Sequence, residues 1–133
     1  MGYDLSPRRK DAGPFHFGAF SWLVLVERTM GTLYPMTHDG PRWVCAFGAD
    51  PRMPAGDGYP RLISNDGFRV TADEARIMAR CARNYVSIQQ AVRLAMQEAP
   101  AEKWAYLLIR QDFVDLFERF APWAEKSGGF RIW

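Results

Sequence analysis

The sequence predicts an α+β fold in which a small antiparallel sheet packs against three to four helices. A long amphipathic helix is expected near residues 72–97, and short apolar or alternating runs at both ends of the chain are typical of strands. A length of 133 residues with 48% hydrophobic content suits a single domain, residues 1–133, that is large enough to bury a core.

The long helix carries the strongest local signals in the chain. Thr71 and Glu74 have the spacing of a capping box, in which each side chain bonds an amide that the first turn leaves free. Pro100 ends the helix, because the residue before a proline avoids the helical conformation. Steps of three and four predict a buried face made of Ala75, Met78, Ala82, Tyr85, Ile88, Val92 and Ala95.

The other elements follow from apolar runs and turn residues. Strands are expected over residues 2–6, 15–17, 43–47, 61–63, 68–70 and 130–133. Further helices are expected from Trp22 to about Met30 with Ser21 as the cap, over 101–110, and from a cap at Asp112 to Gly128-Gly129. The run after Ser21 is short enough to fit a strand as well. Residues 48–60, rich in Pro and Gly, predict a long irregular connection, either a functional loop or a surface insertion.

Composition excludes several classes of function. The formal charge of +2 is too small for the basic footprint of a nucleic-acid-binding protein. The longest apolar run, Trp22 to Val26, is too short to span a membrane, and the N-terminus lacks the apolar core of a signal peptide. Two cysteines in apolar surroundings fit a reduced compartment. We therefore expect a cytoplasmic protein without a membrane partner, and homo-oligomerisation stays open.

No metal or cofactor is expected. A zinc site would need His16, His38, Cys45 and Cys81, and no two of them have the close spacing of zinc ligands. The turn around Asp66 lacks the alternating acidic ligands of a calcium loop, and the glycines form no phosphate-binding motif.

A row of arginines is the first candidate binding surface. Arg76, Arg80 and Arg83 lie at steps of four and three on the polar face of the long helix, so each faces a like charge. The row is either a solvated face, paired within the fold to Asp112, Asp115 or Glu118, or a docking strip for an acidic partner.

A pocket between two turns is the rival interpretation. Asn65, Asp66 and Gly67 in one turn and Gly128 and Gly129 in the other could surround a small ligand, with Trp133 or Trp43 as a wall. These residues could equally serve only to turn the chain. Hydrolysis would require His38 and Asp39 to meet Ser64 or Cys45, which sequence cannot establish.

Three segments carry a resemblance: Gly-Tyr-Asp-Leu at the start, Ser64-Asn65-Asp66-Gly67 before the long helix, and Ser127-Gly128-Gly129-Phe130 followed by Ile132-Trp133. With the central segment leading through Val70-Thr71-Ala72-Asp73-Glu74-Ala75 into the helix, the sequence resembles a group of small uncharacterised bacterial and phage proteins over its two ends and its centre, about half of the chain. The resemblance implies a bacterial or phage origin in the cytosol and says little about chemistry.

The residues favour a non-enzymatic binding protein. Fourteen per cent aromatic content, the arginine row and the long Pro/Gly connection are features of interaction surfaces. We expect a protein partner, acidic where it meets the arginines, with the chain acting as a regulator, an inhibitor or an immunity-type protein. The alternative is a small-ligand-binding protein or hydrolytic enzyme with its pocket near residues 64–67 and 128–130.

Overall fold

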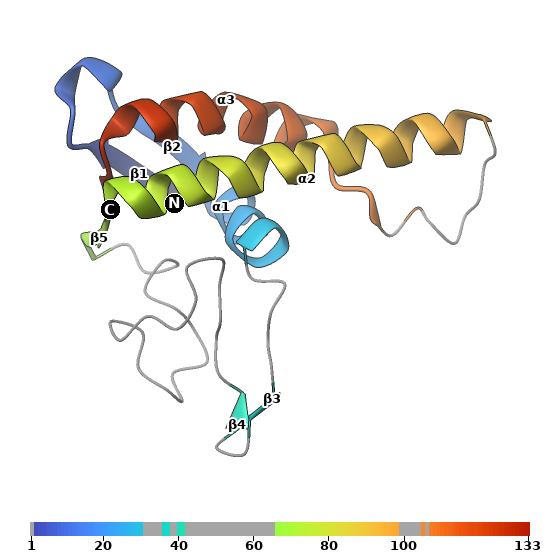
Figure 1. Ribbon diagram of the computed structural model, residues 1–133, viewed down its shortest axis with the longest axis horizontal. Helices are drawn as coiled ribbons and strands as arrows, with labels where there is room; N and C mark the ends of the chain where they lie inside the picture. The colour runs from blue at the N-terminus through green and yellow to red at the C-terminus, as the bar shows by residue number, and fades with distance from the viewer. Residues whose placement is uncertain (1, 31–35, 38–39, 42–65, 99–104, 106) are drawn as a thin grey trace.

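The computed structural model describes residues 2–30, 36–37, 40–41, 66–98, 105 and 107–133 (Figure 1). The described elements in chain order are β1 Gly2–Pro7, the 3-10 turn η1 Lys10–Ala12, β2 Phe15–Gly18, α1 Ala19–Val24, the π-helix η2 Leu25–Met30, β3 Met36–Thr37, β4 Gly40–Pro41, β5 Phe68–Val70, α2 Ala72–Glu98, α3 Gln111–Ser127 and β6 Phe130–Ile132. The strands predicted at 43–47 and 61–63, and the connection over 48–60, lie outside these residues.

The main sheet confirms the predicted α+β class. Its four strands are antiparallel in the order β2-β1-β6-β5, while β3 and β4 pair with each other. The closing strand β6 is therefore central, and Ile132 lies between Leu5 of β1 and Phe68 of β5. These three side chains are buried on one face, and strand alternation puts their neighbours on the other face.

Aromatic side chains join the inner face of the sheet to α1 and α3. The Phe17 ring centroid is 5.0 Å from that of Trp22 in α1 and 5.3 Å from that of Phe120 in α3. Phe130 of β6 meets the same two rings at 6.5 and 6.2 Å, mostly edge to face. Much of the high aromatic content that suggested a binding surface thus forms the core, although Phe20 is 80% exposed.

Helix α2 lies antiparallel to α3, beside it, and begins at the predicted capping box (Figure 1). The Thr71 amide donates to Glu74 Oε1 at 2.9 Å, and the Glu74 amide donates to Thr71 Oγ at 3.2 Å. The buried face differs from the predicted one: Ile88 is 57% exposed and Ala95 is also exposed. The buried residues are Ala75, Met78, Ala79, Ala82, Val86 and Gln89.

The difference in the buried face has a geometric cause. Ala75, Ala82 and Gln89 are seven residues apart, as are Ala79 and Val86, which is the repeat of helices packed nearly antiparallel. The predicted row departs from this seam at Ile88, whereas Tyr85 of the same row still meets Phe117 of α3, with ring centroids 6.4 Å apart. An amide was not expected in this seam, but Gln89 is only 2% exposed.

The start of α1 also differs from the prediction. The helix begins at Ala19 with Gly18 at the cap position, and Ser21 lies inside the first turn instead of capping it. The buried Ser21 hydroxyl donates to the Gly18 carbonyl at 2.9 Å. After Val24 the chain continues as the π-helix η2, so the run left open between helix and strand is helical.

The segment before α3 contradicts part of the predicted helix over 101–110, because residues 108–110 belong to no helix. Side chains of α2 bond its backbone instead. Gln89 Nε2 donates to the Leu107 carbonyl at 2.8 Å, and the Ile109 amide donates to Gln89 Oε1 at 3.0 Å. Arg93 Nη2 donates to the Ile109 carbonyl at 2.5 Å. These bonds replace those that a helix would make within the segment.

Helix α3 begins at Gln111, with Arg110 at the cap position, so Asp112 lies in the first turn and is not the cap as predicted. The helix continues through Pro122 and ends at Gly128, whose φ of 70° is left-handed. The predicted stop at the two glycines is therefore confirmed. Within the described part of the chain, no helix has both the length and the apolar character to cross a membrane.

The hydrogen bonds of Gln89 predict that its replacement lowers the free energy of unfolding more than replacement of its neighbour Gln90 does. Replacing Gln89 with Leu keeps the bulk of the side chain but leaves the Leu107 carbonyl and Ile109 amide without this partner, at a cost of about 2 kcal/mol in the free energy of unfolding. Gln90→Leu, at an exposed position, should change it by less than about 0.5 kcal/mol. Urea unfolding of both variants measures the difference, and equal effects would contradict the role of Gln89.

The turn between α3 and β6 predicts that Gly129 tolerates a side chain less well than Gly13 does. Gly129 has φ of 96°, and a Cβ atom there would lie 2.6 Å from the Val70 carbonyl oxygen. Gly129→Ala should therefore cost about 3 kcal/mol or more, because backbone strain adds to the overlap. Gly13 has φ of 69° with nothing within 4 Å of such a Cβ, so Gly13→Ala should cost about 1 kcal/mol. Urea unfolding that ranks the two variants in the opposite order would overturn this account.

Candidate functional site

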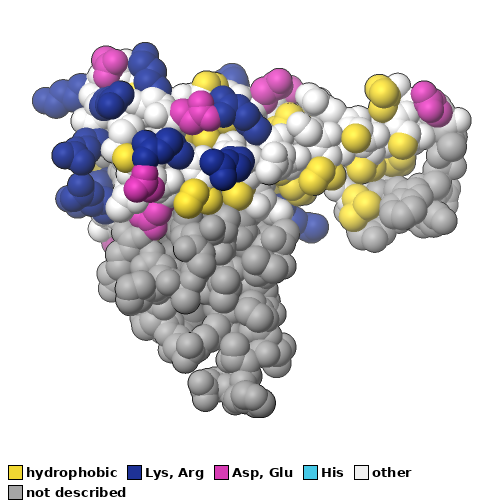
Figure 2. Space-filling model, in the orientation of Figure 1, with side chains coloured by type: hydrophobic (Ala, Val, Ile, Leu, Met, Phe, Trp, Pro, Cys, Tyr) yellow, Lys and Arg dark blue, Asp and Glu magenta, His cyan; other side chains and the backbone are white. Residues whose placement is uncertain are grey.

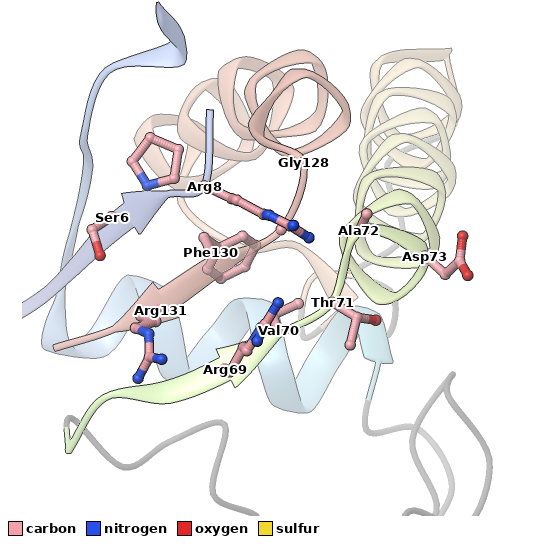
Figure 3. Close-up of a pocket in the computed structure, with 12 residues that line it drawn as sticks. Ser6, Arg8, Arg69, Val70, Thr71, Ala72, Asp73, Gly128, Phe130 and Arg131 are labelled. Atoms are coloured by element: carbon pink, nitrogen blue, oxygen red, sulfur yellow. The ribbon is translucent and has the colours of Figure 1, made fainter. Parts of the chain in front are cut away.

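A groove of about 540 Å³ lies where β5 leads into α2 and where α3 leads into β6 (Figure 3). Three arginines line it, Arg8, Arg69 and Arg131, and they come from three separate segments of the chain. We call this the arginine groove. Its volume is in the range of sites that hold a small molecule or a side chain of a partner.

The sheet register places two of the arginines next to each other. Arg131 of β6 lies directly opposite Arg69 of β5 and, on its other side, opposite Ser6 of β1. The flanking residues of both strands are buried, so alternation points these arginines away from the core. Trp133 Nε1 donates to Ser6 Oγ at 2.8 Å and holds the hydroxyl beside this pair.

Arg8 enters the groove from a different direction. Its amide donates to the Gly129 carbonyl at 2.8 Å, and the Arg9 amide donates to the Ser127 carbonyl at 2.9 Å, so the chain after β1 is fixed to the α3–β6 turn. Figure 3 shows the Arg8 side chain reaching past Phe130 and Gly128 toward the start of α2.

The glycine turn brings the walls of the groove together. The Cβ position of Gly129 lies 3.0 Å from the Ala72 nitrogen as well as close to the Val70 carbonyl. A side chain there would separate the end of α3 from the start of α2. Gly128 also lines the groove, and the Arg9 side chain occupies the space where its Cβ atom would lie, with Arg9 Cγ at 3.1 Å.

The groove has a strong positive charge. Of its lining residues, Asp73 carries the sole carboxylate; that group forms an ion pair with Arg76 and points away from Arg8 in Figure 3. Arg8 and Arg131 make no ion pair with any residue in the described ranges. Figure 2 shows basic side chains gathered at this end of the molecule, whereas apolar side chains dominate the far half of α2.

The arginine row on α2 is exposed along its length. Arg76 pairs with Asp73, and Arg83 pairs with Glu125 of α3, with Nη2 to Oε2 at 3.1 Å. Arg80 has no ion pair among the residues that the structure describes. The paired carboxylates are therefore not those considered from sequence: Asp112 bonds Arg110, and Asp115 bonds Gln111.

The residues of the predicted pocket lie at opposite ends of β6. Gly67 donates its amide to the Ile132 carbonyl, and its Cβ position is 2.9 Å from the Trp133 ring. Asp66 is exposed next to it, and Asn65 and Trp43 lie outside the described residues. Gly128 and Gly129 precede the strand and line the arginine groove. Of the residues that line the groove, the sequence analysis therefore named Gly128 and Gly129 as candidate ligand-binding residues. It did not name the three arginines.

A sequence signal for two of those arginines was present. Phe68-Arg69-Val70 and Phe130-Arg131-Ile132 share one pattern, with an arginine between two large apolar residues. Each predicts an exposed arginine on a strand buried on one face. Their proximity could not be predicted, because sequence does not show that the two strands pair.

The described residues offer little for covalent catalysis. His16 Nδ1 and Asp4 Oδ1 are 2.7 Å apart on the exposed face of β1 and β2, and a Cβ atom at Gly2 would lie 3.0 Å from His16 Nε2. Burial raises the pKa of the Cys81 thiol, and Arg80 offsets part of that rise, so the sulfur is protonated at neutral pH. His38, Asp39, Ser64 and Cys45 fall outside the described ranges.

Metal binding finds no support in the same part of the chain, where no group of three or more His, Cys, Asp or Glu residues could hold an ion. The arginine groove is suited instead to holding an anion, since guanidinium groups donate several hydrogen bonds in a fixed plane. Comparison with protein-family models, with curated proteins and with solved structures found no match for this chain.

Proposed function

We propose that this protein is a non-enzymatic binding module that recognises an acidic surface of a protein partner, as a regulator, inhibitor or immunity-type protein does. The observation that carries the proposal is the arginine groove. Arg8, Arg69 and Arg131 line it, and Arg8 and Arg131 make no ion pair within the described residues. A partner carboxylate would supply a counter-charge to Arg8 and Arg131.

The position of Arg131 supports binding in preference to stability. Like charges directly opposite each other on neighbouring antiparallel strands destabilise a sheet, and Arg131 faces Arg69 in this way. A threonine would suit an exposed strand position better. An arginine that weakens the sheet is expected where it contributes to binding.

The surroundings of the groove extend the same surface. Trp133, which is 49% exposed, lies directly after β6 and two residues after Arg131, and interfaces are enriched in Trp and Arg. Arg76 is tied to the groove residue Asp73, and Arg80 lies one turn further along α2. The arginine row predicted from sequence is therefore a second part of the proposed docking surface, with the groove at its end.

Binding of an acidic peptide tests the proposal. A labelled peptide mixture rich in Glu should bind the protein, and the double variant Arg69→Glu/Arg131→Glu should weaken binding by about tenfold or more, because it reverses charges that contact the ligand. Affinity should fall as salt rises. Fluorescence anisotropy at two salt concentrations measures both effects.

The matched control is Arg119→Glu, a charge reversal at an exposed position of α3 outside the groove. It should leave the affinity within about twofold, since long-range charge effects are screened. Equal losses for the groove variant and the control would show that net charge alone attracts the peptide, and the proposed surface would be wrong.

The like-charge pair predicts a gain in stability. Arg131→Thr should raise the free energy of unfolding by about 0.5 kcal/mol at low salt, because it removes the repulsion and adds a residue that favours strands. The gain should shrink at high salt. Urea unfolding at both salt concentrations measures the change; a loss of stability at low salt would show that Arg131 serves the fold.

A further inference from the structure

We infer that the arginine groove holds a phosphate group, carried as a phosphorylated side chain by the acidic partner. This inference rests on the proposed function and names the chemistry of the group that the groove receives. It depends on the positions of the guanidinium groups in the groove as well as on their positive charge.

The first step concerns charge. Arg69 and Arg131 are cross-strand neighbours, so their side chains start about 5 Å apart and face the same side of the sheet. A single carboxylate brings one negative charge to this pair, whereas a phosphate monoester brings close to two at neutral pH. The dianion therefore matches two adjacent guanidinium groups better than a carboxylate does.

The second step concerns direction. Arg8 follows β1 and extends beside the α3–β6 turn, while Arg69 and Arg131 come from neighbouring strands of the sheet (Figure 3). A phosphate monoester has three terminal oxygens that point in different directions and can accept bonds from donors on several sides. A planar carboxylate has two oxygens and suits one guanidinium plane. Donors on separate sides of the groove favour the tetrahedral group.

The third step concerns the backbone beside the arginines. Thr71 and Ala72 line the groove, and the capping box uses the amides of Thr71 and Glu74. The amides between them begin the helix and have no acceptor within it. These groups add to the arginine site and do not define it.

Matched peptides test the inference. Three labelled degenerate mixtures differ at one central residue, which is phosphoserine, glutamate or serine. The phosphoserine mixture should bind about tenfold more tightly than the glutamate mixture, since charge-assisted bonds to a third donor are gained. In Arg8→Ala both mixtures should bind more weakly, and the ratio should fall to about one, because phosphoserine binding loses its third donor and so weakens more than glutamate binding.

Two variants serve as controls. Arg8→Lys keeps the charge but loses the planar fork, so it should recover only part of the phosphoserine preference. Lys10→Ala removes a charge from an exposed position two residues away and should keep the full preference. Urea unfolding of each variant confirms that the folded state is retained.

The outcomes separate this inference from the proposed function. Equal affinity for the phosphoserine and glutamate mixtures would overturn the phosphate assignment and leave the acidic-partner proposal standing. Binding of neither mixture would end both. Competition by inorganic phosphate, against sulfate at equal ionic strength, distinguishes the source of the phosphate. If phosphate alone competes as well as the unlabelled phosphoserine mixture at equal concentration, the side-chain assignment is wrong and a free phosphate compound is the ligand.

Discussion

The close approach of two backbone segments determines the rest of the architecture. Gly129 lies so near Val70 and Ala72 that a single Cβ atom would collide with both. This contact fixes the start of β6 beside the β5–α2 junction and lets β6 run between β1 and β5. The central place of β6 then positions Ile132 in the core and Arg131 on the opposite face. Core and candidate site thus depend on the same turn.

Local signals were enough to predict much of this fold. The capping box at Thr71 and Glu74, the alternation in the first two strands and the glycine stop at Gly128 depend on neighbours in sequence, and the structure confirms them. The predicted helix start at Trp22 was wrong because a serine before an apolar run can also bond backward from inside a turn, as Ser21 does.

The remaining differences come from contacts between distant residues. The seam of α2 follows the path of α3, so Gln89 is buried and Ile88 is exposed, which helix periodicity alone could not decide. Residues 108–110 do not form the predicted helix, and the side chains of Gln89 and Arg93 make hydrogen bonds with the backbone of Ile109 instead. The proximity of Arg69 and Arg131 could be predicted only by knowing that β5 pairs with β6. The arginine row on α2, in contrast, follows from helical spacing alone.

The groove draws its arginines from positions 8, 69 and 131, almost the full length of the chain. An occupant that touches all of them bridges strands that associate only in the native state. Its binding energy is therefore added to the native state and not to the unfolded ensemble. Such an occupant would link neighbouring strands non-covalently. Arginines that repel each other in the free protein would then both be attracted to the same anion and would stabilise the sheet.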